Sequence, residues 1–385
     1  MSNLKSSNMD NKINILFVMI YFKGGGSERL VYNLALKLDR NFFNPFILYF
    51  FENEILKEFN RNEVHLYHVP KIKRFDISTM QRIGDIIKEN NIHIVNAHHF
   101  MPMVYSFYGC KIKNNCKLIY TEHAKSEVDK ISWRWQKIGG YLLNRSDAAV
   151  GVTEEVSEAI QNSFKLQPSK TITIKNGVDL NAYNGCNNKE KLRKELKIAE
   201  DEKVIGIVAN LKRIKNHIFL LRAFDELIKS YKNAKLLLVG QGFKDDPENT
   251  EEDLRNYADK NGLKEKVLFL GYRSDIPELL SIMDIFCLTS FKEGLPISLI
   301  EAMAAGLPIV GTDVEGIRDT INPDKNGFLV KAGDVNGLKR ALQVLLKDES
   351  LKQRFGMESR LLSKEYSLQQ CVNKYQNLFR LVLNH

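Results

Sequence analysis

Short apolar, β-branched segments alternate along the chain with longer segments in which apolar residues recur at helical spacing. This alternation is typical of parallel strands joined by crossover helices, and it predicts an α/β protein. The segment 27–39 shows the helical spacing clearly, since Leu30, Leu34 and Leu38 fall on one face. In the first half of the chain, strands are predicted at 13–19, 46–50, 65–68, 94–97, 117–121, 148–152 and 171–174.

The same pattern restarts after the polar stretch 181–202, with strands predicted at 204–208, 235–239, 266–270, 284–288 and 308–312. A chain of 385 residues is longer than one hydrophobic core usually serves. We therefore predict two Rossmann-like domains, residues 1–180 and 181–367. A last helix, within 368–385, follows the completed second domain, and we expect it to dock back on the first.

Composition is that of an ordinary globular protein and leads us to expect a cytoplasmic location. The apolar run 13–22 is too short to span a bilayer, and Lys23 with three glycines follows it in place of a cleavage site. The five cysteines form no Cys-x-x-Cys pair and are expected to be reduced. The net charge of +9 is compatible with an anionic membrane, an acidic substrate or nucleic acid, but scattered solvated lysines are the favoured explanation. We expect no nucleic-acid partner.

The segment 284–305 carries the strongest chemical signal. An apolar strand leads into a short polar turn, and Pro296 then opens a helix. Ligands of open parallel sheets bind at such strand ends, and the backbone N–H groups near Ile297 and Ser298 lack partners in the first helical turn. The helix dipole favours a phosphate there, so the sequence predicts an anion site.

Two carboxylates border this predicted site. Glu293 lies in the turn before the helix, and Glu301 lies five residues after Pro296 with its side chain angled back toward the helix N-terminus. Because carboxylates repel a diphosphate, we expect them to accept hydrogen bonds from hydroxyl groups, on a sugar for Glu293 and on a ribose for Glu301. The alternative is that they are an ordinary turn residue and a solvated helix residue.

A basic loop follows the predicted strand 204–208. Lys212, Arg213 and Lys215 gather at the carboxyl end of this strand. Cations at this position can neutralise a diphosphate leaving group, which is the electrostatic role that a metal ion has in other enzymes. The alternative is a solvated basic loop.

Polar side chains also follow two neighbouring strands of the first half. His98 and His99 come after one strand, and Glu122 and His123 come after the next. We expect all four at one sheet edge that faces a cleft, with His123 as the best candidate to contact hydroxyl groups or move a proton. A hydrogen-bonded structural histidine is the alternative for each.

Two further segments of the first half carry weaker signals. Gly24, Gly25 and Gly26 follow the first strand and allow close approach of the backbone to a ligand, although a tight turn explains them as well. Trp133 and Trp135 lie among cations, a composition suited to lipid headgroups. Peripheral membrane contact is one interpretation, and an ordinary helix packed on its domain is the other.

Taken together, these motifs resemble those of retaining glycosyltransferases of family 4, also called group 1, over residues 13–375. The resemblance is carried by EGLPISLIEAMAAGLPIV, which holds Glu293 and Glu301 with seven residues between them, and by four shorter motifs. These are NGVD at 176–179, GYR at 271–273, NGFLV at 326–330 and GGGSER at 24–29. His98 and His123 lie at the family's usual histidine positions.

The resemblance implies a GT-B fold, in which two Rossmann-like parallel-sheet domains face each other across a cleft. It implies that Glu293 and His123 are catalytic, that Lys215 binds the donor diphosphate and that the loop 24–26 closes over it. The family commonly has arginine where this chain has Asn210, and Arg213 is its nearest substitute. The implied donor-binding set is Gly24, Gly25, Gly26, Asn210, Arg213, Lys215, Arg273, Gly294, Leu295, Pro296, Ile297, Ser298 and Glu301. The acceptor-side candidates are His98, His99, Glu122, Trp133 and Trp135.

The implied reaction transfers a sugar, with retention, from a nucleotide-sugar that is a UDP-sugar on family frequency. The acceptor is a saccharide or lipid-linked saccharide of surface polysaccharide or glycoconjugate assembly, at the inner face of the membrane. The chain has no Asp-x-Asp sequence, so we expect neither a metal nor another cofactor. Two alternatives remain open, a non-catalytic scaffold that binds nucleotide-sugars and a nucleotide-sugar epimerase. The spacing of Glu293 and Glu301 argues against the epimerase.

Overall fold

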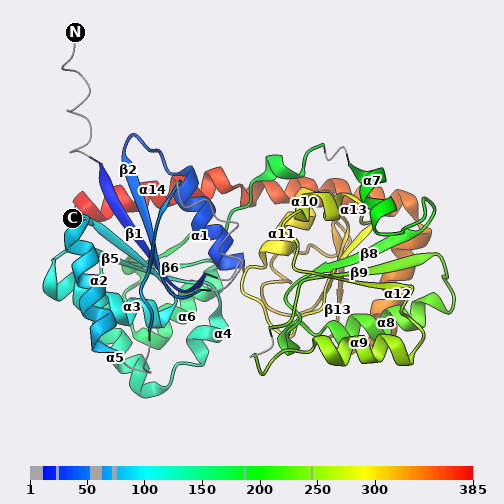
Figure 1. Ribbon diagram of the computed structural model, residues 1–385, viewed down its shortest axis with the longest axis horizontal. Coiled ribbons are helices and arrows are strands. Elements are labelled where there is room, and N and C mark those ends of the chain that lie inside the picture. Colours follow the sequence, from blue (N-terminus) through cyan, green and yellow to red (C-terminus); the bar gives the residue numbers. More distant parts are fainter. Residues whose placement is uncertain are drawn as a thin grey trace, which may run out of the picture. The chain divides into compact units, whose positions relative to one another are not determined.

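A computed structural model of the protein describes residues 12–22, 26–52, 63–71, 76–185, 188–243 and 246–384 (Figure 1). The chain forms two compact units, Met1–Gly177 with Leu368–His385, and Val178–Ser367. The polar stretch 181–202, expected at the boundary, lies inside the second unit and contains the short helix α7 (Lys189–Glu195).

The first unit is built on a seven-stranded parallel sheet with the strand order β3-β2-β1-β4-β5-β6-β7. Each predicted strand of this half is present, within a few residues of its expected ends. The strands are β1 (Ile13–Phe22), β2 (Phe43–Glu52), β3 (His65–His68), β4 (Ile94–His98), β5 (Lys117–Glu122), β6 (Ala148–Gly151) and β7 (Thr171–Thr173).

In the described part of this unit, helices follow β1, β3, β4, β5 and β6, and two of them begin at side chains that accept hydrogen bonds from the first helical turn. Asp76 caps α2 in this way and Thr153 caps α6. The main helices of the unit are α1 (Gly26–Lys37), α2 (Ile77–Glu89), α3 (Phe100–Phe107), α4 (Lys125–Asp129), α5 (Trp133–Asn144) and α6 (Glu154–Phe164).

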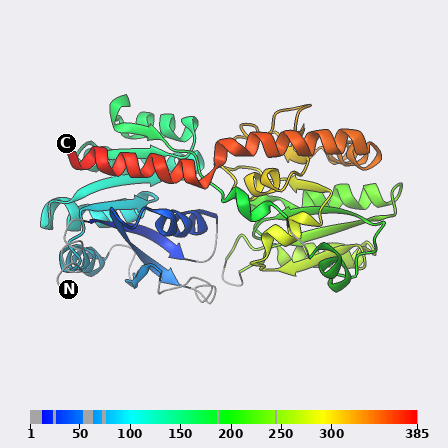
Figure 2. The ribbon, with the colours of Figure 1, turned by 90° about the horizontal axis from the view of Figure 1, so that it is seen from above.

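The last helix, α14 (Leu368–Asn384), belongs to this first unit although it lies at the other end of the sequence. Figure 2 shows it in red beside the blue and cyan elements. Its buried Tyr375 and Phe379 join one core with Phe17 and Phe43 of the sheet. Both ends of the chain therefore contribute to the same hydrophobic core.

The second unit has a six-stranded parallel sheet with the strand order β10-β9-β8-β11-β12-β13. Its strands are β8 (Lys203–Val208), β9 (Ala234–Val239), β10 (Val267–Gly271), β11 (Ile285–Leu288), β12 (Ile309–Thr312) and β13 (Gly327–Val330). Its main helices are α8 (His217–Ile228), α9 (Glu251–Lys260), α10 (Ile276–Ser281), α11 (Ile297–Ala304), α12 (Val335–Lys347) and α13 (Glu349–Ser363). The predicted pair of Rossmann-like domains is confirmed, although the pattern did not predict edge strand β13.

In each sheet the order of strands reverses at one point, between β1 and β4 in the first unit and between β8 and β11 in the second. The connections leave the sheet in opposite directions there, which opens a crevice at the carboxyl ends of the strands. Most of the predicted site residues follow these strands or β5, the neighbour of β4. Topology thus gathers residues that are far apart in the sequence.

Two findings concern properties inferred from composition. Within the described residues, no helix is both long and apolar enough to cross a membrane. Cys110 pairs with Cys116 as a disulfide, so the prediction of reduced cysteines is wrong for this pair. Cys116 lies six positions after Cys110, and a π-helical segment, Tyr108–Lys113, accompanies the 5.1 Å separation of their Cα atoms. Such a local turn leaves no recognisable spacing. Cys186 lies outside the described residues.

Candidate functional site

An ion pair lies at the switch point of the second sheet. Lys215 closes a short helical turn after β8, and Glu293 lies in the loop after β11. The ammonium nitrogen of Lys215 is 2.7 and 2.8 Å from the two carboxylate oxygens of Glu293. Ser290 donates a further hydrogen bond to the same carboxylate at 2.5 Å. The Glu293 side chain is 8% exposed, so its charge is held where water screens it little.

Polar groups join the two loops that carry this pair. The hydroxyl of Thr289 donates to the backbone carbonyls of Lys215 and Asn216, at 3.3 and 3.2 Å. The backbone N–H of Phe291 donates to the carbonyl of Ile214 at 2.8 Å. These bonds fix the backbone on both sides of the ion pair, and the side chains have little freedom to separate unless a ligand replaces one partner.

Helix α11 begins directly after the Glu293 loop, with Pro296 as its N-cap residue. Ile297 and Ser298 form its half-buried first turn, whose N–H groups have no partner within the helix. Gly316, with a φ of 77°, packs on this loop so closely that a Cβ atom there would lie 1.8 Å from the carbonyl oxygen of Gly294. Gly316 is a residue that the sequence reasoning missed, and a glycine in the polar turn after a strand was the available signal.

The other predicted donor-binding residues are placed differently. Asn210 is half-buried after β8, and Arg213 is exposed. Arg273 forms a two-pronged ion pair with Asp275, with N–O distances of 2.7 and 2.5 Å, and lies 3.6 Å from Glu195 of α7. Its guanidinium group therefore already has carboxylate partners. Gly24 and Gly25 lie outside the described residues, and Gly26 is the first residue of α1.

In the first unit, the four polar residues predicted at the ends of β4 and β5 lie together. Nδ1 of His98 is 2.9 Å from Nε2 of His123, and Nδ1 of His99 is 2.9 Å from a carboxylate oxygen of Glu122. His98 is fully buried, whereas the His99 side chain is 26% exposed. Parallel pairing of β4 with β5 sets this arrangement, since His98 is in register with Thr121.

The histidines of this cluster differ in charge. Burial lowers the pKa of His98 to about 3, and burial together with the neighbouring histidines lowers the pKa of His123 well below its usual value. Burial opposes the charged form of His99 also, but Glu122, with smaller effects of Glu28 and Glu127, raises its pKa. His98 and His123 are therefore neutral near pH 7, and His99 is the histidine that tends to hold a proton.

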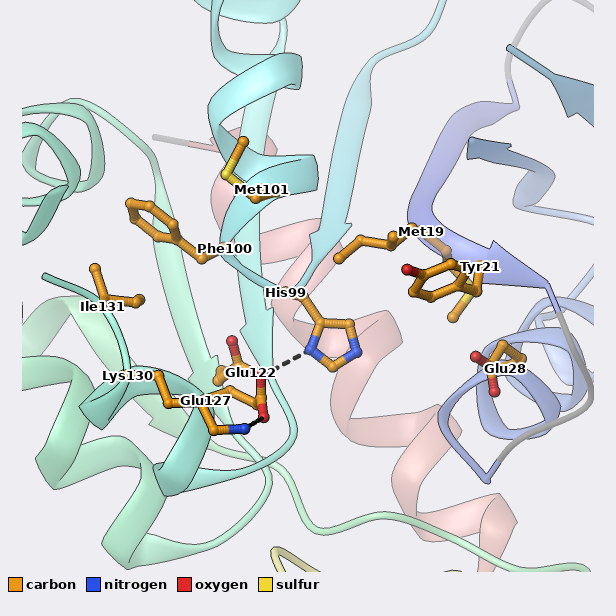
Figure 3. Close-up of a pocket in the computed structure, with 11 residues that line it drawn as sticks. Met19, Tyr21, Glu28, His99, Phe100, Met101, Glu122, Glu127, Lys130 and Ile131 are labelled. Carbon is orange, nitrogen blue, oxygen red and sulfur yellow. Dashed lines mark hydrogen bonds and ion pairs between the residues drawn. The ribbon is translucent and has the colours of Figure 1, made fainter. Parts of the chain in front are cut away.

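A pocket of about 370 Å³ opens beside His99 (Figure 3). His99 and Glu122 line it, whereas His98 and His123 do not. Residues that the sequence reasoning did not select form the rest of the wall. They include Tyr21, Phe100, Ile131, Glu28, Glu127 and Lys130. These residues come from β1, α1, α3, α4 and the turn after α4, so no local motif could have identified them.

The two tryptophans of α5 have different surroundings. Trp133 is 61% exposed, and the cationic groups of Arg134 and Lys137 lie 5.3 and 5.0 Å from its ring centre. Trp135 packs edge-on against Phe100, with 6.1 Å between ring centres. Trp133 is therefore available at the surface, whereas Trp135 holds the helix to its unit.

Sequence comparisons place the chain among known proteins. The profile of the family described as Glycosyltransferase Family 4 matches residues 24–182, and that of Glycosyl transferases group 1 matches residues 188–361. EpsD of Bacillus subtilis, a protein assigned as a glycosyltransferase, is 30% identical over 79% of this chain and 80% of its own length. The N-acetyl-alpha-D-glucosaminyl L-malate synthase of Bacillus anthracis is 28% identical over 84% of each chain.

A third relative is the UDP-Gal:alpha-D-GlcNAc-diphosphoundecaprenol alpha-1,3-galactosyltransferase of Escherichia coli, which is 24% identical over 86% of this chain and 84% of its own. Solved structures agree on the fold. A glycosyltransferase from Rickettsia africae aligns with a TM-score of 0.84 at 21% identity, over 97% of this chain and 99% of that one. Anabaena HepE in complex with UDP aligns with a TM-score of 0.82 at 20% identity, over 96% and 100%.

Proposed function

Because the chain belongs to the group 1, family 4 glycosyltransferases, we propose that it transfers a sugar from a UDP-sugar to a saccharide acceptor with retention of anomeric configuration. The Lys215–Glu293 pair at the start of α11 is the observation that carries this proposal. The UDP bound to the structural neighbour HepE and the UDP-Gal in the name of the E. coli relative support UDP as the donor nucleotide.

The second unit has the groups that a nucleotide-sugar diphosphate requires. The first turn of α11 offers backbone N–H groups and the positive end of the helix dipole to a phosphate. Lys215 adds a full positive charge beside this turn. A diphosphate that binds Lys215 replaces Glu293 as its partner, and the carboxylate then becomes available to hydroxyl groups of the sugar. Glu301, half-buried on the same helix, is assigned to the ribose.

In the proposed reaction, the bond between the sugar C1 and the diphosphate oxygen breaks while a bond from C1 to the acceptor oxygen forms on the same face. Negative charge builds on the leaving diphosphate, and Lys215 with the α11 N-terminus stabilises it. A diphosphate oxygen takes the proton of the acceptor hydroxyl. These groups perform the charge stabilisation for which other enzymes use a divalent cation, so we propose that the reaction needs no metal.

We also propose that the enzyme works at the inner face of the membrane through the outer surface of α5. Trp133, Ile138 and Tyr141 on this helix are 61, 46 and 56% exposed. Arg134 and Lys137 lie among them, and the helix contains no acidic residue. Exposed aromatic and aliphatic groups with cations suit an anionic leaflet such as the cytoplasmic one. The acceptor is then a lipid-linked saccharide presented at that surface.

The proposal is tested by incubating the protein with UDP-glucose, UDP-galactose, UDP-N-acetylglucosamine, GDP-mannose and ADP-glucose, each with a panel of p-nitrophenyl glycosides. We expect an α-linked product from one UDP-sugar, identified by NMR, at the same rate with and without EDTA. A β-linked product would contradict retention, and loss of activity in EDTA would contradict metal independence. Binding of a nucleotide-sugar without turnover indicates a scaffold, and an epimerised donor indicates an epimerase.

A further inference from the structure

The lining residues of the pocket beside His99 all belong to the first unit, and none of them is among the residues assigned above to donor binding. We propose that this pocket binds an uncharged sugar ring of the acceptor, and that His99, held by Glu122, is the residue that selects it. The inference rests on the proposed glycosyl transfer and names the class of acceptor. It assigns His99 to substrate recognition and Glu122 to positioning.

Glu122 has its hydrogen-bonding capacity occupied by protein groups. One carboxylate oxygen accepts from Nδ1 of His99 at 2.9 Å and from the backbone N–H of His123 at 2.8 Å. The other accepts from the hydroxyl of Tyr120 at 2.8 Å, and the side chain is 1% exposed. An ionised carboxylate can only accept, so the proton of His99 lies on Nδ1. The Nε2 atom of His99 therefore remains for a ligand.

The pocket has the chemistry that a sugar ring requires. Tyr21, Phe100 and Ile131 supply apolar walls, against which the C–H groups of a sugar can pack, and Figure 3 shows His99 between these walls. The volume of about 370 Å³ lies within the usual range of ligand pockets. A sugar hydroxyl can bond Nε2 of His99 in either protonation state, and the charge-assisted hydrogen bond that it accepts from protonated His99 is the stronger one.

The charges around the pocket disfavour an anionic acceptor. Among its described lining residues, Lys130 and His99 are the groups that can carry a positive charge. Lys130 lies 2.7 Å from Glu127, His99 lies 2.9 Å from Glu122, and Glu28 adds a third carboxylate. An acid such as L-malate, which appears in the name of the B. anthracis relative, would have to replace Glu127 as the partner of Lys130 or Glu122 as the partner of His99. An uncharged sugar can bind while both ion pairs stay intact.

The experiment compares the affinity of the full chain for p-nitrophenyl glycosides of glucose, galactose and N-acetylglucosamine with that for p-nitrophenyl glucuronide. Glucuronide has a carboxylate where glucose has a hydroxymethyl group, so it isolates the effect of charge. We expect at least one uncharged glycoside to bind about 10-fold more tightly than glucuronide, and His99→Gln to weaken it about 10-fold, as for one lost hydrogen bond. His65→Gln, on the exposed edge strand β3, is the matched control and should bind normally.

A second variant separates recognition from structure. Glu122, Glu28 and Glu127 raise the pKa of His99, while His98 and His123 lie beside it uncharged near pH 7. Glu122→Gln removes the nearest carboxylate, so the pH midpoint of glycoside affinity should move lower. An unchanged midpoint, equal affinity for glucuronide, wild-type affinity in His99→Gln, or no glycoside binding would each overturn the inference. Glycoside binding without sugar transfer would contradict the proposed function alone.

Discussion

Lys215 and Glu293 balance each other's charge in the absence of donor, which allows a direct test of their roles. Lys215→Ala should lower kcat/KM by about 100-fold or more, because the diphosphate loses the cation that stabilises it as it departs. Lys212→Ala is the matched control. Lys212 lies in the same loop, but its ammonium group is 2.6 Å from Asp246, so its loss should change kcat/KM little. Steady-state rates with one UDP-sugar measure kcat/KM for both variants. Equal losses in Lys215→Ala and Lys212→Ala would exclude a specific role of Lys215 in stabilising the diphosphate.

The buried His98 predicts how stability depends on pH. Its pKa is about 3 in the folded protein and near 6.5 when unfolded, so the unfolded chain binds more protons between these values. Stability should therefore fall as the pH drops below about 6.5, by up to about 1.4 kcal/mol per pH unit for this group. Denaturant unfolding at pH 7.5 and 5 should show a smaller loss for His98→Gln than for the native protein. Equal losses would show that His98 titrates normally.

Residues within one motif, and polar residues at the ends of neighbouring strands such as His99 and Glu122, could be predicted from the sequence. Residues that reach a site from other elements could not. Glu293 and Glu301 share a single loop and helix, so their spacing was visible. Tyr21 and Glu127 reach the first-unit pocket from different elements, and nothing in their local sequence marks them. The sequence pattern also assigned Trp133 and Trp135 together to membrane contact. It could not separate them, because the packing of Trp135 depends on Phe100 in another helix.

Helix α14 shows that an element can be essential to a unit from which it is distant in sequence. Phe379 is fully buried, with its ring 6.2 Å from those of Phe17 and Phe43, whereas Leu381 on the same helix is 50% exposed. Phe379→Ala should lower the free energy of unfolding by about 3–5 kcal/mol. Leu381→Ala should change it by about 0.5 kcal/mol or less. Chemical denaturation measures both, and similar values would contradict the docking of α14 in this core.

Helix α5 carries the prediction of membrane contact. Flotation with vesicles rich in phosphatidylglycerol should recover the native protein with the lipid, and Trp133→Ala with Tyr141→Ala should reduce that fraction about fivefold or more. Met357→Ala with Leu361→Ala is the control, because these residues of α13 are 68 and 55% exposed but lie in the second unit. Recovery that is equal in all three proteins, or absent from all of them, would refute the assignment of this surface.

Most strands and the last helix were predictable because their apolar runs are long or strongly periodic. Edge strand β13 was not, because its four residues begin with glycine and are too few to establish a period. Helix α7 was missed for a different reason. Its sequence, KEKLRKE, is almost entirely polar and buries only Leu192, so it gives no amphipathic pattern. Whether such short or polar segments form a strand or a helix depends on their tertiary contacts and not on their local sequence pattern.

At the scale of the whole molecule, two sheets of the same design have different chemistry at their switch points. The second unit places a lysine, a carboxylate and a helix N-terminus together, which suits a diphosphate. The first unit places a carboxylate-bound histidine beside apolar walls, which suits a sugar ring. The doubling of the architecture was readable in the alternation of strands and helices. The difference in chemistry required the pairing of strands that are distant in sequence.

Calorimetric titration of the full chain with UDP, GDP and ADP tests the central claim most directly. The account predicts that UDP binds, that GDP and ADP bind at least about 10-fold more weakly, and that Lys215→Ala and Glu301→Gln each weaken UDP binding while Lys212→Ala does not. Failure of all three nucleotides to bind would contradict a nucleotide-sugar site in the second unit. UDP binding unchanged in Lys215→Ala and Glu301→Gln would place that site elsewhere.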